Sequence, residues 1–337
     1  MRAESPCCNK LAGYRMLGRV ILATLLLTLL MAGCSPAPKP DIRIGTNIWP
    51  GYEPLYLARS LGWFRESGIR LVEYTSATGT MNALRHGSIE AGALTLDEVL
   101  ALTQEGVDLR VVLLLDVSNG ADAVIAQAGI DTPEDLRGRT IGVESSAVGG
   151  YIVDRMLEKS GLSLRDVHIL PLTLDEHELA FTSHRVDAVV TLEPVKSRLL
   201  AHGAKVIFDS SLIPGEIIDV LAVRSEVFNA SPDAFAELTE KWFQALAYMQ
   251  RQPDDAARRM QPRLRVSPDQ LGEQYTGLQL GTLQLNQSFF NNAANPPIKK
   301  AEQLAQVMRD KGLLQRDLDL NRLFAARNMY ANHGDRP

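Results

Sequence analysis

Residues 42–52 read IRIGTNIWPGY and give the first indication of the fold class. Its apolar start, Ile42–Gly45, predicts a strand, and the loop that follows leads into a helical pattern at Leu55–Phe64. Gly68 ends that pattern, and Ile69–Tyr74 predicts the next strand. Strands that alternate with helices in this way are typical of a parallel α/β sheet.

The same alternation continues further along the chain. Thr132 is expected to cap a short helix, because Pro133 suits the first helical position and Asp135 stands where a capping-box acid belongs. The other predicted elements are strands at Ala91–Leu94, Val111–Leu115 and Thr140–Val143, and helices at Met81–Arg85, Asp97–Gln104 and from near Gly149.

Beyond Val223 the pattern becomes helical. Apolar residues recur there at steps of three and four, which predicts one buried helix face that belongs to the core and binds no cofactor: Phe235, Leu238, Trp242, Leu246 and Met249. Two terminal helices are expected near Lys300–Lys311 and Leu318–Asn328, packed back on the first part of the chain.

A weak internal duplication runs through the sequence. Ile44-Gly45 opens a strand–loop–helix unit that reaches Gly51-Tyr52, and Ile141-Gly142 opens another that reaches Gly150-Tyr151. Residues 89–99 and 186–195 echo each other in the same order, with one residue deleted from the second copy. Two equivalent α/β lobes explain both echoes.

The amino terminus has the order of an export signal: basic residues, an apolar run from Val20 to Met31, then Ala32-Gly33-Cys34. The run is shorter than the about 20 residues that a bilayer-spanning helix needs. A Cys directly after Ala-Gly resembles the lipobox of bacterial lipoproteins, which implies removal of residues 1–33 and lipidation of Cys34. A membrane-anchoring signal without lipidation is the alternative, and translation starts at Met1 or Met16.

Charge and cysteine content narrow the function further. The formal net charge of −5, which becomes about −8 without residues 1–33, argues against nucleic acid, since phosphates call for a basic surface. Cys7 and Cys8 leave with the signal, so an acylated Cys34 leaves no thiol for a disulfide, a nucleophile or a metal. Residues 34–40 have the composition of an extended tether.

Several motifs together resemble the nitrate/sulfonate/taurine group of ABC-transporter periplasmic solute-binding proteins, which also includes binders of thiamine precursors. They cover about residues 42–225, and they are residues 42–52, Leu55–Ala58, Gly62–Phe64, Ala83–Gly92, Leu136–Gly142, Asp187–Val189 and Glu193-Pro194. The resemblance implies a two-lobed, type II α/β fold. Each lobe is a mixed, mostly parallel sheet flanked by helices, with further helices at the C-terminus.

The resemblance also implies two crossovers between the lobes, which we expect near Val124–Ile130 and Glu216–Val223. The first lobe would then be discontinuous, with residues 41–125 and 222–337, and the second would comprise residues 126–221.

The expected function is that of an exported, membrane-anchored lipoprotein, facing the periplasm or the cell exterior. It would capture a small solute between the lobes and deliver it to an ABC permease, as a monomer and without a cofactor. One alternative is a sensor that reports its ligand to a membrane signalling protein. Another is an enzyme of the related pyrimidine-synthase type, but those enzymes carry a Cys cluster and a Lys for pyridoxal phosphate, which the candidate segments lack.

Ligands of open α/β sheets sit beyond the carboxyl ends of the strands. Five segments meet that condition, and the candidate ligand-binding residues in them are Asn47, Trp49 and Tyr52; Ser76 and Thr78; Thr95 and Asp97; Ser145 and Ser146; and Thr191, Glu193 and Asp219.

Each candidate has a structural alternative. Trp49 offers a flat apolar face with an N–H donor, or it packs under its own loop. Hydroxyls before a helix bind an anionic group or serve as ordinary caps, which applies to Ser76, Thr78 and the serines at 145 and 146. Asp97 likewise suits an N-cap.

The chemistry of these segments favours binding. None contains Arg or Lys, so we expect a ligand that carries an amine or another cationic nitrogen. His177 and His184 could share a helix face, but no third ligand has metal-site spacing, so no metal is expected. Neither a Gly-x-Ser-x-Gly elbow nor a P-loop occurs. We therefore expect no catalytic residue.

Overall fold

The computed structural model describes residues 41–144, 148–291 and 297–324. Across these ranges, no helix combines the length and apolar character needed to cross a bilayer. The expected signal at residues 1–33, the lipidation site Cys34 and the tether at 34–40 lie outside the described residues.

The first sheet begins within residues 42–52. Its central parallel strands are β1 (Ile42–Thr46), between β2 (Ile69–Glu73) and β3 (Ala91–Thr95). The strands β10 (Ile218–Arg224), β4 (Leu109–Ser118) and β11 (Leu278–Leu280) continue the sheet from β3 in antiparallel pairing. Nine of the ten residues of β4 are buried, as the long apolar run there requires.

The second sheet repeats this plan. Its order is β7 (His168–Pro171), β6 (Thr140–Val143), β8 (Ala188–Leu192), β5 (Asp122–Ala126) and β9 (Lys205–Asp209). β6 pairs in parallel with β7 and β8, whereas β5 pairs antiparallel with β8 and β9. Parallel pairing is therefore confined to one half of each sheet, and the predicted mixed α/β fold is confirmed.

The sequence echo corresponds to this repeated plan. Gly45 of β1 faces Gly92 of β3, and Gly142 of β6 holds the same register position beside β8. A Cβ at Gly45 would lie 2.5 Å from Ile89, and one at Gly142 would lie 2.7 Å from Leu172. In both sheets a neighbouring apolar side chain occupies the space that a larger residue would need.

The chain passes from the first sheet to the second between Ser118 and Asp122, and it returns between Asp209 and Ile218. All of β5 pairs within the second sheet, so this change of sheet falls before the crossover expected near Val124–Ile130. The return falls beside the second expected crossover. The division into lobes at 125/126 and 221/222 stays a prediction.

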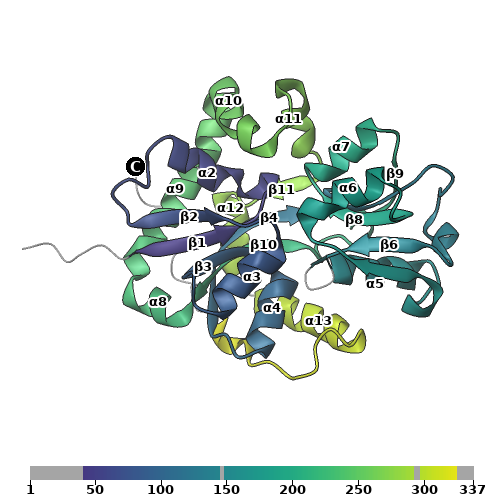
Figure 1. Ribbon diagram of the computed structural model, residues 1–337. Coiled ribbons are helices and arrows are strands. Elements are labelled where there is room, and N and C mark those ends of the chain that lie inside the picture. The colour runs from purple at the N-terminus through teal and green to yellow at the C-terminus, as the bar shows by residue number, and fades with distance from the viewer. Residues whose placement is uncertain (1–40, 145–147, 292–296, 325–337) are drawn as a thin grey trace, which may run out of the picture. The chain divides into compact units, whose positions relative to one another are not determined.

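Helices flank both sheets (Figure 1). Those around the first sheet up to its return strand are α2 (Glu53–Ser60), α3 (Ala77–Arg85) and α4 (Leu96–Gln104). Those of the second sheet are α5 (Val148–Lys159), α6 (His177–Thr182) and α7 (Val195–Ala201). Pro133–Leu136 forms a short 3-10 helix, and the predicted capping box is present, because Asp135 accepts the backbone N–H of Thr132 at 3.0 Å.

The remaining helices follow the return to the first sheet. They are α8 (Ser225–Ala230), α9 (Pro232–Arg251), α10 (Pro253–Leu264), α11 (Pro268–Gln274), α12 (Leu283–Asn291) and α13 (Pro297–Asp310). The predicted face of α9 is buried at Phe235, Leu238, Trp242 and Leu246, which are core residues. The helix expected at Leu318–Asn328 is wrong in its described part. Only a 3-10 turn forms at Leu320–Arg322, where Asp319 accepts the Asn321 N–H at 3.1 Å and closes a local turn.

Candidate ligand-binding cleft

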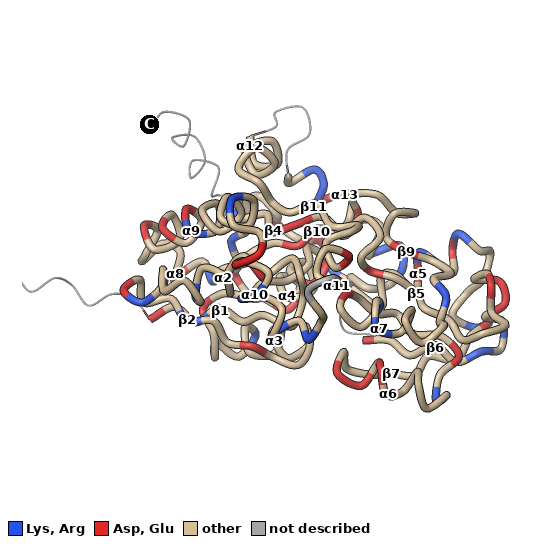
Figure 2. Tube along the Cα trace, turned by 90° about the horizontal axis from the view of Figure 1, so that it is seen from above, with Lys and Arg blue, Asp and Glu red and all other residues tan. Residues whose placement is uncertain are grey.

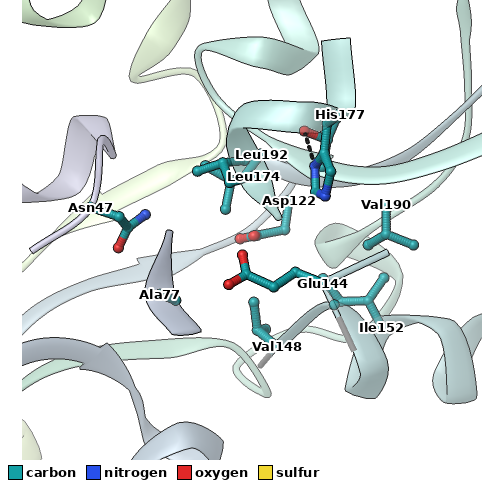
Figure 3. A pocket seen from close by; sticks show the side chains of 12 residues that line it. Asn47, Ala77, Asp122, Glu144, Val148, Ile152, Leu174, His177, Val190 and Leu192 are labelled. Carbon is teal, nitrogen blue, oxygen red and sulfur yellow. Dashed lines mark hydrogen bonds between the residues drawn. The ribbon is translucent and has the colours of Figure 1, made fainter. Parts of the chain in front are cut away.

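Two small cavities, of about 30 and 20 Å³, share five lining residues, and Figure 3 shows the larger one. Each cavity is lined by residues from the part of the chain that forms the first sheet and from the part that forms the second. The two cavities together are called the cleft cavity. The lining residues common to both are Asn47, Ala77, Asp122, Val148 and Leu192. Spaces of this size hold a few water molecules at most.

The loop after β1 forms one wall of the cleft cavity. The Trp49 indole donates from Nε1 to Asp116 Oδ2 at 3.0 Å, and the Tyr52 hydroxyl donates to Asp219 Oδ1. Gly51 lies between these contacts, and a Cβ on it would lie 1.9 Å from Asp116 Oδ2. Because glycine has no Cβ, the loop can approach the Asp116 carboxylate this closely. Residues 49–52 therefore pack directly against β4 and β10 of the first sheet.

Asp116 and Asp219 are directly opposite each other on β4 and β10, and both are buried (Figure 2 shows the acidic positions in red). Burial raises the pKa of Asp116 to about 8, and burial together with the charge of Asp116 raises the pKa of Asp219 well above its ordinary value. Two buried carboxyls at opposite register positions cannot both ionise readily, so at least one of them stays protonated near pH 7.

The start of α4 adds two more buried acids. Glu98 accepts the Thr95 backbone N–H at 2.9 Å, as the acid of a capping box does. Burial raises the pKa of Glu98 well above its usual range and that of the adjacent Asp97 to about 6. Glu98 lines the cleft cavity, whereas Asp97 does not.

One pair of contacts ties the two sheets' halves together across the cleft. Glu144, which follows β6, accepts hydrogen bonds from the Thr78 backbone N–H, at 2.8 Å, and from the Thr78 hydroxyl. Thr78 belongs to the first turn of α3. The structure is therefore a closed form, with a carboxylate of the second sheet held by a helix start of the first.

The second sheet contributes Asp122 and His177 to the lining (Figure 3). Asp122 is 3% exposed, and its Oδ2 has no hydrogen-bond partner among the residues that the structure describes; burial raises its pKa to about 6. His177 Nδ1 lies 3.2 Å from the Thr191 hydroxyl, and its Nε2 is unpartnered. Burial lowers the pKa of His177 to about 4, so the ring is neutral near pH 7.

Two cationic side chains pair with acids near the cleft, Glu193 of the candidate segments and Glu216 at the expected second crossover. Lys196 lies 3.3 Å from Glu193 and donates to the Gly120 carbonyl at 2.9 Å. Arg155 donates to Glu216 at 2.8 and 3.0 Å. The candidate segments contain no Arg or Lys, yet helix residues outside them pair with these two acids.

Arg263 of α10 fixes the loop after β1 from behind. It donates to the Asn47 carbonyl at 2.7 Å, pairs with the fully buried Glu53, and stacks 3.6 Å from the centre of the Tyr56 ring. The C-terminal helices thus hold the wall of the cleft in place.

The expected site residues separate into three groups. Those that line the cleft cavity are Asn47, Trp49, Tyr52, Thr95, Thr191 and Asp219. Those with other roles are Ser76, which caps α3; Thr78, which holds Glu144; Asp97; and Glu193, which accepts the Ser197 N–H at 3.1 Å. Ser145 and Ser146 lie outside the described residues, and whether any of these residues binds a ligand stays a prediction.

Four titratable lining residues were not among the expected ones: Glu98, Asp122, Glu144 and His177. Glu144 adjoins the serines that were expected to bind, and Glu98 belongs to the capping box at Thr95. No sequence motif marks Asp122, because its side chain reaches the cavity only through the passage of the chain from the first sheet to the second. His177 has no metal-like partner, because α6 ends at Thr182 and His184 lies beyond it; across the described ranges no group of three potential metal-ligating side chains occurs.

A family model described as NMT1/THI5 like matches residues 49–256. A protein of Brucella abortus (strain 2308), whose name states binding but no ligand, is 26% identical over 228 residues, which span 66% of this chain and 66% of that protein. The taurine-binding periplasmic protein of Escherichia coli (strain K12) is 25% identical over 194 residues, 55% of this chain and 60% of the relative. The chain thus spans less than two thirds of these relatives' length.

Solved structures share the fold over more of the chain. The alkanesulfonate-binding protein SsuA from Xanthomonas axonopodis pv. citri, bound to MOPS, has a TM-score of 0.71 at 21% identity and covers 84% of this chain and 97% of its own. The desulfurization enzyme DSZB has a TM-score of 0.62 at 18% identity, with 86% and 98% covered. The predicted type II fold is confirmed, and it occurs in binding proteins and in an enzyme.

Proposed function

Because the chain belongs to the NMT1/THI5-like family, we propose that it is an extracytoplasmic solute-binding lipoprotein. It captures a small organic solute between its two sheets and delivers it to an ABC importer. Relatives named as binding proteins, one of them periplasmic, support binding and export. The Ala-Gly-Cys34 motif after the apolar run supports the lipid anchor.

The observation that carries the proposal is the composition of the cleft cavity. Trp49 and Tyr52 come from the loop after β1, whereas Asp122 and His177 belong to the second sheet and its helix α6. A solute in this space would touch both halves at once. Contacts to both halves stabilise the closed form over the open one, which is how a ligand shifts a hinged protein.

The closed form also implies an open one. The cleft cavity is too small for an organic solute, and the Glu144–Thr78 contact closes it, so entry of a solute requires the two halves to separate. The two connections between the sheets are the natural hinge. Ser118 and Ser210 join these connections through their hydroxyls at 2.8 Å.

Binding fits the chain better than catalysis by the pyrimidine-synthase route. Cys7, Cys8 and Cys34 are the only cysteines of the sequence, and all lie within or directly after the export signal. No lysine lines the cleft cavity, so a Schiff base to pyridoxal phosphate has no candidate among the lining residues.

A thermal-shift screen followed by small-angle scattering tests the proposal. The full-length chain, purified in detergent, is screened against nitrate, sulfonates, amines, pyrimidines and amino acids. A solute at 100 times its Kd adds about 2.7 kcal/mol of stability, which a melting curve detects easily. We expect the solute that binds to reduce the radius of gyration of the Cys34→Ser variant purified without detergent. Binding with an unchanged radius would overturn closure, and no binder in the whole screen would overturn solute capture.

A further inference from the structure

The lining of the cleft cavity is strongly acidic. Glu98 and Asp219 lie on the side of the first sheet, and Asp122 and Glu144 on the side of the second. None of the residues that line the two cavities is Lys or Arg, and His177 stays neutral near pH 7, because burial lowers its pKa to about 4. An anionic group that entered this space would find no cationic side chain among the described lining residues.

Most of these acids already have donors within the protein. Glu144 accepts from Thr78, Glu98 from the Thr95 backbone, and Asp219 from the Tyr52 hydroxyl. Asp122 differs, because its Oδ2 is buried without a hydrogen-bond partner. A buried carboxylate oxygen without a donor is costly to the folded protein, and a cation that reached it would remove that cost.

Lys196 does not supply this donor. Its charge lowers the pKa of Asp122, but its ammonium group pairs with Glu193 and donates to the Gly120 carbonyl. Lys196 does not line the cleft cavity. The unpartnered Asp122 oxygen therefore points to a donor from outside the chain.

We propose that the cleft selects small organic solutes that carry a primary ammonium group, and that this group donates to Asp122 Oδ2. The proposal rests on the function proposed above and names the class of its ligand. The ammonium carries three donors, so it can also reach Glu144, whose carboxylate points into the same space in Figure 3. The rest of the solute would extend toward Trp49 when the halves close.

Matched pairs of probes that exchange an ammonium for a methyl group test the charge preference. They are taurine and 1-propanesulfonate, β-alanine and butyrate, and ethanolamine and 1-propanol. Each is titrated into the full-length chain by calorimetry. We expect the ammonium member of any pair that binds to be at least about tenfold tighter, since hydrogen bonds between charged groups are the strong ones.

Asp122→Asn identifies the residue responsible, because it keeps the shape of the side chain and removes its charge. We expect it to weaken the ammonium member about tenfold and to leave its methyl partner unchanged. Asp317→Asn is the matched control: it removes the same charge from a side chain that is 98% exposed, and it should change neither affinity. The melting temperature of Asp122→Asn shows that the variant is folded.

The two proposals fail separately. A methyl member, nitrate or a sulfonate that binds and compacts the protein while no ammonium compound does so would keep solute capture and overturn the ammonium assignment. The assignment also fails if Asp122→Asn binds the ammonium member as tightly as the natural chain does, or if none of the three ammonium probes binds.

Discussion

Gly51→Ala should destabilise the protein through a contact that can be located to the atom. The new Cβ would lie 1.9 Å from Asp116 Oδ2 and 2.4 Å from Trp49 Nε1, the two atoms of one hydrogen bond. Ordinary contact begins near 3.4 Å, so the carboxylate must move by about 1.5 Å. That shift breaks the bond.

The magnitude follows from two costs. An indole N–H and a buried carboxylate oxygen left without each other cost about 1–3 kcal/mol, and overpacking of a filled site costs about 1–3 kcal/mol more. We expect a loss of about 2–6 kcal/mol in the free energy of unfolding, and a fall of at least about 4 °C in melting temperature for a chain of this size.

The assay is thermal unfolding followed by circular dichroism, with Gly272→Ala as the control. Gly272 lies in α11 with no atom within 4 Å of an added Cβ, so alanine there should be neutral or slightly stabilising. Trp49→Phe removes the same N–H donor without the clash, and it should lose only the hydrogen-bond part. If Gly51→Ala melts within 1 °C (roughly the reproducibility of such curves) of Gly272→Ala, the assigned contact is wrong.

Three further predictions concern other parts of the chain. Arg263→Met should cost about 3–5 kcal/mol, measured by denaturant unfolding, because it leaves the buried Glu53 unpaired, and adding Glu53→Gln should restore most of the loss. Burial raises the pKa of Asp122 to about 6, so the stability that its protonated form contributes is present below about pH 4 and is lost as the pH rises through 6. Between pH 4 and pH 8, the free energy of unfolding obtained from melting curves should therefore fall by roughly 3 kcal/mol less in Asp122→Asn than in the natural chain. Asp97, Asp116 and Glu53 keep part of this pH dependence in both proteins. Cys34→Ser should abolish fatty-acid labelling in cells, and an unlabelled natural chain whose mature form lacks Cys34 would contradict the anchor.

The alternation of apolar runs with helical patterns predicted the α/β class, and the resemblance to the solute-binding family implied the two-lobed type II arrangement. Ile42–Thr46 and Thr140–Val143 form the strands that their composition indicates, and the echo between them corresponds to a repeated sheet plan. The helix predicted at Leu318–Asn328 is wrong in its described part, because a local turn at Asp319 forms there instead. Such side-chain turns compete with helices at close sequence distance, where hydrophobic periodicity is a weak guide.

The site was harder to predict than the fold. Trp49 and Tyr52, which line the cleft cavity, were named because ligand-facing loops follow parallel strands, and Asp219, which also lines it, was named from the expected second crossover. Asp122 was missed, since nothing in its local sequence distinguishes a buried acid at a change of sheet from a solvated turn residue. The cations that reach Glu193 and Glu216 come from helices outside the candidate segments, so pairing of these acids depends on the tertiary fold.

Isothermal titration of an Ala77→Leu variant measures whether the cleft cavity is the binding site. Ala77 lines both parts of the cavity, and a leucine there fills space that a solute needs, whereas Ala128→Leu places the same change in an exposed turn. With the solute that stabilises the natural chain most, we predict that Ala77→Leu loses at least about tenfold in affinity, about 1.4 kcal/mol, and that Ala128→Leu loses none. Equal affinity of both variants for that solute would contradict capture between the two sheets.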